Sequence, residues 1–88
     1  MKLERRVRVR NQSGLHARPA TALVKLLQRV SSSVWLRHRK ETVNAKSIMS
    51  ILMLAAKKNA LIEITVDGED AEITMTHLIT AFEKEFGD

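Results

Sequence analysis

The sequence predicts an α+β protein in which helices cover one face of a single sheet. Segments with a hydrophobic period of two alternate with segments of helical period, in the order strand, helix, strand, strand, helix, strand, helix. The outward positions of the first two expected strands are polar, which is typical of antiparallel sheets with one solvated face. We therefore expect two layers, and one domain over residues 1–88.

The first strand is expected over Leu3 to Arg10, where Leu3, Val7 and Val9 alternate with charged residues. A turn follows at residues 11–14, and the period becomes helical from Pro19, whose missing N–H costs nothing in a first helical turn. The buried face of this helix is expected to contain Ala20, Leu23, Val24, Leu27 and Val30, and residues 31–33 to end it.

The second strand is expected from Val34, with His38 inward, and the third over residues 42–44. Ser47 is expected to be the N-cap of a helix from Ile48 to Ala56. Asn59 is expected to close this helix in a left-handed conformation.

The fourth strand is expected over residues 61–66, and a turn at 67–68 precedes the last helix. Asp70 and Glu72 complement the dipole at the start of this helix. Its core face is expected to contain Ala71, Met75, Leu78, Phe82 and Phe86.

Composition excludes several classes of function. The chain has no cysteine, which excludes a disulfide framework, a thiolate metal site and a cysteine nucleophile. No apolar run approaches the ~20 residues that span a bilayer, and the basic N-terminal segment has no apolar block behind it. His38 and His77 lack ligand spacing. We expect a cytoplasmic protein without metal or cofactor.

Charge is distributed unevenly along the chain. Residues 1–44 hold 11 Lys/Arg and 2 Glu, a net +9, whereas residues 45–88 hold 4 Lys and 8 Asp/Glu, a net −4. Such a basic half indicates either an acidic partner or nucleic acid. Aromatic residues make up only 3% of the chain, which disfavours base stacking.

The segment Gly14-Leu15-His16-Ala17-Arg18-Pro19-Ala20 has the strongest chemical character. His16 is expected directly before a helix, whose free N–H groups at Ala17 and Arg18 suit an anion. The partial positive charge there favours a neutral imidazole, and the Arg18 guanidinium adds a permanent cation. His16 could therefore accept a phosphoryl group as a nucleophile. The alternative is a polar surface histidine without a chemical role.

This segment resembles the active-site signature of the HPr family, the histidine-containing phosphocarriers of the bacterial phosphoenolpyruvate-dependent phosphotransferase system. Val43-Asn44-Ala45-Lys46-Ser47-Ile48-Met49 resembles the family's second signature, around a regulatory serine. The resemblance implies an open-faced sandwich with strand order 1-4-2-3 under three helices, and a monomer.

The resemblance also implies a chemical role for each residue. Nδ1 of His16 would accept a phosphoryl group from phosphorylated enzyme I and pass it to the A domain of a sugar-specific enzyme II. Arg18 and the Ala17 amide would stabilise the phosphorylated state. The protein would be a covalent carrier in a relay, with no turnover of its own.

A second functional surface is expected around Ser47. The resemblance implies that a dedicated kinase can phosphorylate Ser47, where a dianion would oppose docking of acidic partners. The alternative is that Ser47 only caps its helix. If Ile51 and Leu54 face the core, four apolar residues point outward as a docking surface: Ile48, Met49, Leu52 and Met53.

Two alternative functions remain open. One is a regulatory relative of the same fold that acts by binding proteins. The other is a nucleic-acid-binding module on the outer face of the sheet, formed by Arg6, Arg8, Arg10, Trp35, Arg37 and Arg39. Those residues could equally form a solvated face that Glu63 partly neutralises across the strands.

Overall fold

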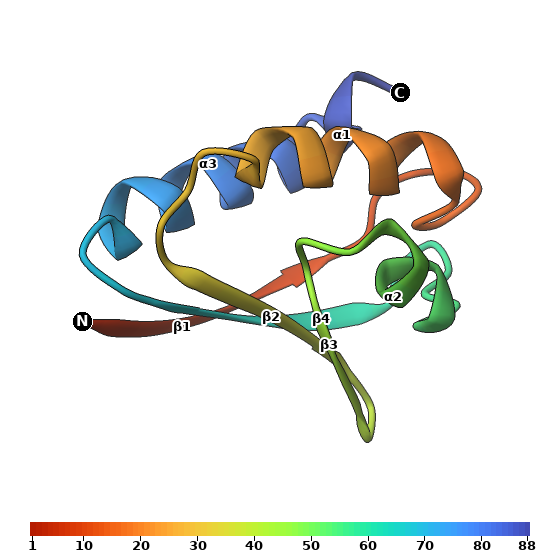
Figure 1. Ribbon diagram of the computed structural model, residues 1–88. Helices are drawn as coiled ribbons and strands as arrows, with labels where there is room; N and C mark the ends of the chain where they lie inside the picture. Colours follow the sequence, from red (N-terminus) through yellow and green to blue (C-terminus); the bar gives the residue numbers. More distant parts are fainter.

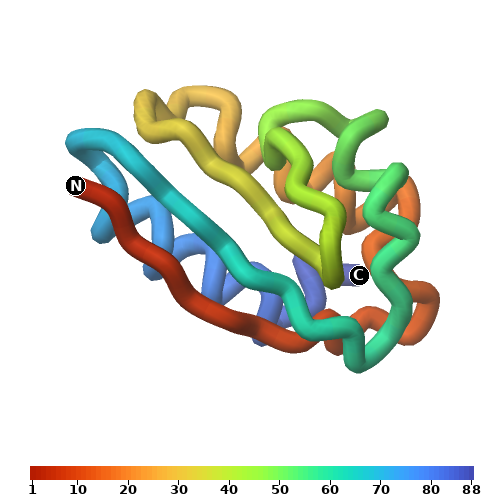
Figure 2. Tube along the Cα trace, turned by 90° about the horizontal axis from the view of Figure 1, so that it is seen from below, coloured from red at the N-terminus to blue at the C-terminus, as the bar shows by residue number.

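Four antiparallel strands form one sheet in the order β1-β4-β2-β3, which confirms the predicted fold class. The computed structural model describes residues 1–88, and its strands are β1 (Lys2–Arg8), β2 (Ser33–His38), β3 (Glu41–Asn44) and β4 (Leu61–Asp67). Figure 2 shows the four strands side by side.

All three helices lie on one face of the sheet, and the other face is open (Figure 1). They are α1 (Ala17–Leu27), α2 (Ile48–Met53) and α3 (Ala71–Glu83), and a short 3-10 turn, η1 (Glu85–Gly87), follows α3. None of these helices combines the length and apolar character that crossing a membrane requires.

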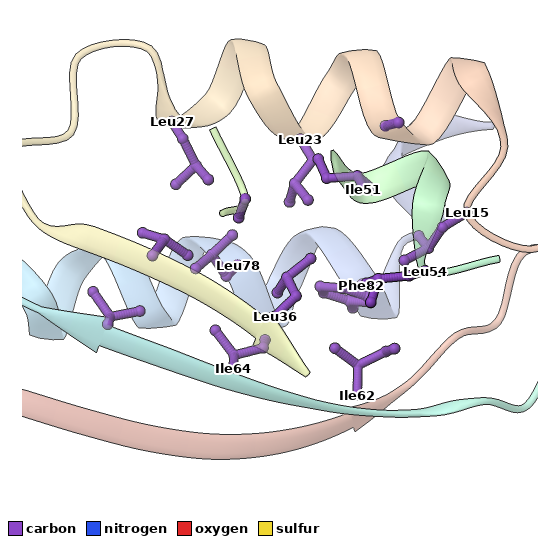
Figure 3. Packing of buried hydrophobic residues seen from close by; sticks show 14 of the residues in the cluster. Leu15, Leu23, Leu27, Leu36, Ile51, Leu54, Ile62, Ile64, Leu78 and Phe82 are labelled. Atoms are coloured by element: carbon purple, nitrogen blue, oxygen red, sulfur yellow. The ribbon is translucent and has the colours of Figure 1, made fainter. Parts of the chain in front are cut away.

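The core fills the space between the helices and the inner face of the sheet (Figure 3). The predicted alternation of the strands is confirmed, because Val34, Leu36, Ile62, Ile64 and Val66 are buried while their neighbours are more exposed. The helices contribute, among others, Leu23, Leu27, Ile51, Leu78 and Phe82.

The first strand and first helix differ from their predicted bounds. β1 ends at Arg8, two residues early, although Val9 still donates its N–H to the Ala60 carbonyl at 3.0 Å. α1 begins at Ala17, two residues before Pro19. It ends at Leu27, because tighter bonds such as Val30 N–H to the Leu27 carbonyl at 3.1 Å replace the α-helical pattern. Val30 still packs against the core.

The second helix is shorter than predicted. It ends at Met53 rather than Ala56, and Ala55, with φ 49°, is its left-handed residue rather than Asn59. The Ala56 carbonyl instead accepts the Leu15 N–H at 2.9 Å. The segment after α2 is thus paired with the loop before α1. Asn59 does have a positive φ of 74°, but it lies in the turn that leads into β4.

The prediction that the last helix extends to Phe86 is wrong. α3 ends at Glu83, and Glu85 and Phe86 both have a left-handed φ of 55°. The Phe86 ring packs edge-on against Phe82, with ring centroids 4.8 Å apart, so the chain bends back over the core. The last residues consequently lie near the start of α1 (Figure 1).

Asp70 lies at the start of α3, as expected, and its carboxylate makes contacts that the sequence did not predict. Its carboxylate does not cap α3 but accepts the Ser31 N–H at 2.9 Å, the Ser32 N–H at 3.0 Å and the Ser32 hydroxyl. The Ser32 hydroxyl, followed by the Ser31 amide, lowers the pKa of Asp70 to about 2. Asp70 therefore fixes the connection between α1 and β2.

Candidate functional site

A glycine sets the backbone of the loop that carries His16. Gly14 has a φ of +70°, and a Cβ at this position would lie 2.3 Å from the Ala56 carbonyl oxygen. Leu15 is buried beside it. Because only glycine fits this approach without displacing backbone, the loop holds His16 at a fixed place relative to the segment after α2.

His16 is the N-cap residue of α1, but its side chain does not cap the helix. Its backbone is extended, with φ −77° and ψ −171°, and its carbonyl accepts the Ala20 N–H at 3.0 Å. The N–H groups of Ala17 and Arg18 have no acceptor within the protein, and Pro19 has no N–H. Two free donors therefore lie directly after His16, at the positive end of the helix dipole.

Asp88 contacts the side chains of both His16 and Arg18. Its Oδ2 lies 2.9 Å from Nε2 of His16, and its Oδ1 accepts a hydrogen bond from Nη1 of Arg18 at 3.3 Å. The hydrogen bond from His16 is the main reason that the pKa of Asp88 falls below its usual range, and burial opposes this effect. A carboxylate thus occupies the side of the site where His16 and Arg18 converge.

The contact with Asp88 distinguishes the two imidazole nitrogens of His16. An ionised carboxylate only accepts hydrogen bonds, so Nε2 must carry a proton to bond to it. In a neutral imidazole this leaves the lone pair on Nδ1. The His16 side chain is 39% exposed, so this nitrogen belongs to a ring that a partner can reach.

Asn11 and Asp88 are site residues that the sequence reasoning missed. The buried Asn11 donates from Nδ2 to the Glu85 carbonyl at 2.8 Å and to Asp88 Oδ2 at 3.4 Å. Its Oδ1 is buried without a hydrogen-bond partner. Asn11 therefore ties the turn before His16 to the chain after α3. Only its place beside the glycine motif could have drawn attention to it.

Ser47 caps α2 as predicted, because its hydroxyl oxygen accepts the Ser50 N–H at 3.2 Å. The approach to this cap is also fixed. Asn44 Oδ1 accepts the Lys46 N–H at 2.9 Å, and Lys46 Nζ donates to the Val30 carbonyl at 2.6 Å. The second sequence motif thus forms the start of α2 and links it to the segment that follows α1.

The four apolar residues expected to point outward from α2 are exposed, whereas Ile51 and Leu54 are buried. Met49 and Met53 are the most exposed, at 71% and 73%, and Ile48 and Leu52 are close to 40%. α2 packs against α1, near its N-terminal end in Figure 1. An apolar surface therefore lies on the same side of the molecule as the His16 loop.

The open face of the sheet is basic at one end. The register places Arg6, Glu63 and Arg37 in one row across β1, β4 and β2. Glu63 accepts from Arg37 Nε at 3.2 Å and lies 3.8 Å from Arg6 Nε. The hydrogen bond from Arg37 is the largest influence lowering the pKa of Glu63. Trp35, 42% exposed, lies in the next row, opposite Thr65.

The remaining histidines lie apart from the His16 site. His38 Nδ1 lies 3.3 Å from the Leu61 carbonyl, to which it can only donate, and His77 is exposed on α3. No group of three or more His, Cys, Asp or Glu side chains is placed to hold a metal ion.

Comparison with known proteins identifies the family. Residues 3–84 match the family described as "PTS HPr component phosphorylation site". The phosphocarrier protein HPr of Xylella fastidiosa (strain Temecula1) is 38% identical over 86 residues, which covers 98% of this chain and 97% of that protein.

Solved structures agree with the sequence match. HPr-C-His from Thermoanaerobacter tengcongensis superposes with a TM-score of 0.92 at 34% identity, covering 98% of this chain and 97% of that one. Crh, the catabolite repression HPr of Bacillus subtilis, gives 0.66 at 34% identity, covering 91% and 95%. The chain belongs to the HPr family of phosphocarriers of the phosphotransferase system.

Proposed function

We propose that this protein accepts a phosphoryl group on Nδ1 of His16 from phosphorylated enzyme I and passes it to the A domain of an enzyme II. The observation that carries this proposal is the hydrogen bond between Nε2 of His16 and Asp88, which directs the free lone pair to Nδ1. The new P–N bond forms from that lone pair. The bond between phosphorus and the enzyme I atom that carries it breaks, and its electron pair stays on that atom, so no general base is needed.

The phosphoryl group would meet three donors. The Ala17 and Arg18 N–H groups have no other acceptor, and the Arg18 guanidinium is 77% exposed and free to turn toward the phosphoryl oxygens. Asp88 and the phosphoryl group are both anions, so Arg18 exchanges Asp88 for the phosphoryl oxygens. The Nε2–H of His16 keeps its bond to Asp88, which holds the ring in place.

Enzyme I and the enzyme II A domains would dock on the exposed apolar surface of α2, formed by Ile48, Met49, Leu52 and Met53. Methionine side chains adapt to several partners, which suits a carrier that meets a donor and an acceptor in turn. Ser47 lies beside this surface, and a phosphate added there by a kinase would place a dianion against acidic partners. The protein would act as a monomer.

A regulatory role is the second candidate. The similarity to the catabolite repression HPr of Bacillus subtilis favours it, because that protein has the same fold at a comparable identity. A protein that acts only by binding has no need of an imidazole with a free Nδ1 beside two free N–H groups. The carrier function is therefore the better supported one.

Transfer can be tested by incubating the protein with phosphoenolpyruvate and a bacterial enzyme I, followed by intact mass measurement. We expect one added phosphoryl group that is labile in acid. His16→Ala should reduce its formation by at least about a thousandfold, since the acceptor atom is lost. The fold should survive, because the His16 side chain does not cap α1.

Two controls make the result decisive. The same enzyme I must phosphorylate an HPr that it is known to serve, and circular dichroism must show that His16→Ala is folded. An active enzyme I that adds no mass to the folded wild-type protein would support the regulatory role. Acid-stable or unchanged phosphorylation in His16→Ala would place the acceptor elsewhere.

A further inference from the structure

We propose that the basic end of the open sheet face binds a small anion that carries several linked phosphate groups. The site is a depression of about 490 Å³ on the face opposite the helices, the side from which Figure 2 is viewed. Four arginines line it: Arg6 and Arg8 from β1, Arg37 from β2, and Arg39 from the turn after β2. It is separate from the His16 site, none of whose residues lines it.

The sheet register brings these arginines together. β1 and β2 both pair with β4, so Arg6 and Arg37 lie on either side of Glu63. Arg8, two residues beyond Arg6, faces the same side next to Leu61. β1 and β2 therefore place cations in neighbouring rows on either side of β4, on the face of the sheet that no helix covers.

Two of the guanidinium groups are held in place by the protein itself. Arg37 donates from Nε to Glu63 at 3.2 Å and from Nη1 to the Arg39 carbonyl at 2.9 Å. Arg8 donates from Nη1 to the Asn59 carbonyl at 2.9 Å. Each guanidinium has five N–H donors, so both keep free donors toward the depression. Because these side chains are already ordered, less conformational entropy is lost when a ligand binds to them.

The positive charge is not balanced within the depression. Glu63 is its only carboxylate, and it already contacts Arg6 and Arg37. Arg8 and Arg39 contact no carboxylate. A second depression of about 510 Å³ shares Arg39 with the first and adds Lys57 and Lys58, against a single carboxylate, Glu41. The unbalanced cations thus continue around the end of the sheet.

The chemistry of the lining selects the ligand. Guanidinium groups bind phosphate oxygens through paired N–H donors, and cations in separate rows require an anion long enough to reach more than one of them. A single phosphate cannot do this, whereas a di- or triphosphate chain can. Trp35 lines neither depression, so no Phe, Tyr or Trp ring offers stacking for a nucleic acid base. The shared chemistry is a polyphosphate chain, either free or borne by a nucleoside.

The experiment titrates the full-length protein with tripolyphosphate, ATP and orthophosphate, using calorimetry and two-dimensional amide NMR. We expect tripolyphosphate to bind at least about tenfold more tightly than orthophosphate, with shifts at residues 6–8, 37–39 and 59–61. Equal affinity for tripolyphosphate and ATP would indicate a free chain, and tighter binding of ATP a nucleoside-borne one.

The variant Arg8→Gln/Arg39→Gln removes the two cations that have no carboxylate partner, and so leaves Glu63 paired. It should weaken tripolyphosphate binding by at least about tenfold. The matched control is Arg5→Gln/Arg29→Gln, which removes the same charge from exposed positions outside both depressions. The control should change affinity by less than about threefold, and thermal melts should show that both variants are folded.

Three results would overturn the proposal. Equal weakening in the two double variants would mean that only net charge attracts the anion. Shifts confined to Ala17 and Arg18 would place the anion at the start of α1. Tight binding of a short oligothymidylate, without measurable binding of tripolyphosphate, would make the face a nucleic-acid surface instead.

Discussion

His16 and Ser47 occupy equivalent positions, directly before the first residue of α1 and α2, but their side chains do opposite things. The Ser47 hydroxyl accepts the Ser50 N–H and stabilises its helix. The His16 ring leaves the N–H groups of Ala17 and Arg18 free and bonds to Asp88 instead. An N-cap residue whose side chain does not cap its helix thus leaves backbone N–H groups free, and such groups can bind an anion.

The largest loss of stability is expected from a substitution in the loop that carries His16. Gly14→Ala should lower the free energy of unfolding by about 3 kcal/mol, because the new Cβ meets the Ala56 carbonyl and φ is +70°. Gly87→Ala is the matched control, since its φ is +74° but nothing lies within 4 Å of the new Cβ. It should cost only about 1 kcal/mol in urea denaturation. Equal losses would mean that the close approach at Ala56 is unimportant.

Arg18→Ala should slow phosphoryl transfer from enzyme I by about tenfold to a hundredfold, the equivalent of one charge-assisted hydrogen bond. Arg18→Lys should recover part of the rate, because it keeps the charge but loses the planar fork. Rapid-quench measurement of phosphorylated protein gives the rates. Arg29→Ala removes the same charge from an exposed position beyond the C-terminal end of α1. If Arg29→Ala slowed phosphoryl transfer as much as Arg18→Ala, the effect of Arg18 would be only that of its positive charge and not of its position.

Ser47→Ala should lower the free energy of unfolding by about 1 kcal/mol, since the Ser50 N–H loses its acceptor. Phosphorylation of His16 by enzyme I should remain. His16→Ala should show the reverse, with a change in stability below about 0.5 kcal/mol and no phosphorylation. Urea denaturation and intact mass would be measured on both variants. If both lost the same stability, or both kept phosphorylation, His16 and Ser47 would not differ in the way described.

Ser47→Asp provides a second arm of the same experiment. Aspartate is itself a good N-cap, so stability should be retained. Its negative charge should weaken docking of enzyme I by about tenfold, measured as the Kd in calorimetry. Unchanged docking, with Ser47→Ala also unchanged, would remove the surface around α2 from the interface.

Asp88→Asn is expected to have the smallest effect, visible only in the pH dependence of stability. The pKa of Asp88 is lowered, chiefly by the hydrogen bond from His16, so its stabilisation is complete above the ordinary pKa of 3.8. It is lost as the pH falls through the lowered value. The stability advantage of the wild-type protein over Asp88→Asn should thus be constant at higher pH and decline below about 3.8.

Asp70→Asn is the internal reference for this titration. The pKa of Asp70 is about 2, so its contribution should persist to lower pH than that of Asp88. Urea denaturation across the acid range would measure both. A wild-type advantage over Asp88→Asn that does not change with pH would mean that Asp88 is not held in the ionised form by His16 and Arg18.

The sequence predicted the sheet well because strand parity depends on a local repeat. The buried positions of β2 and β4 followed directly from alternation, and the pairing of Glu63 with arginines on both sides followed from the same parity. Ser47 was predicted as a cap because its type and its place before an apolar run are local features.

Contacts between residues far apart in the sequence could not be predicted from these local features. Asp88 reaches His16 only because Glu85 and Phe86 adopt a left-handed φ, which is rare for these residue types. The Phe82–Phe86 contact and the hydrogen bond from Asn11 to the Glu85 carbonyl support this bend. A long-range contact also lies just after α2, where the Ala56 carbonyl accepts the N–H of Leu15.

In the proposed mechanism, Asp88 holds the proton on Nε2 of His16 and leaves Nδ1 to receive the phosphoryl group. Long-range ¹H–¹⁵N NMR of the imidazole, recorded before and after phosphorylation by enzyme I, tests it directly. We expect the unphosphorylated neutral ring to carry its proton on Nε2, and the phosphorylated ring to show phosphorus coupling at Nδ1 with the Nε2 proton retained. Phosphorus on Nε2, or a neutral ring protonated at Nδ1, would contradict the account.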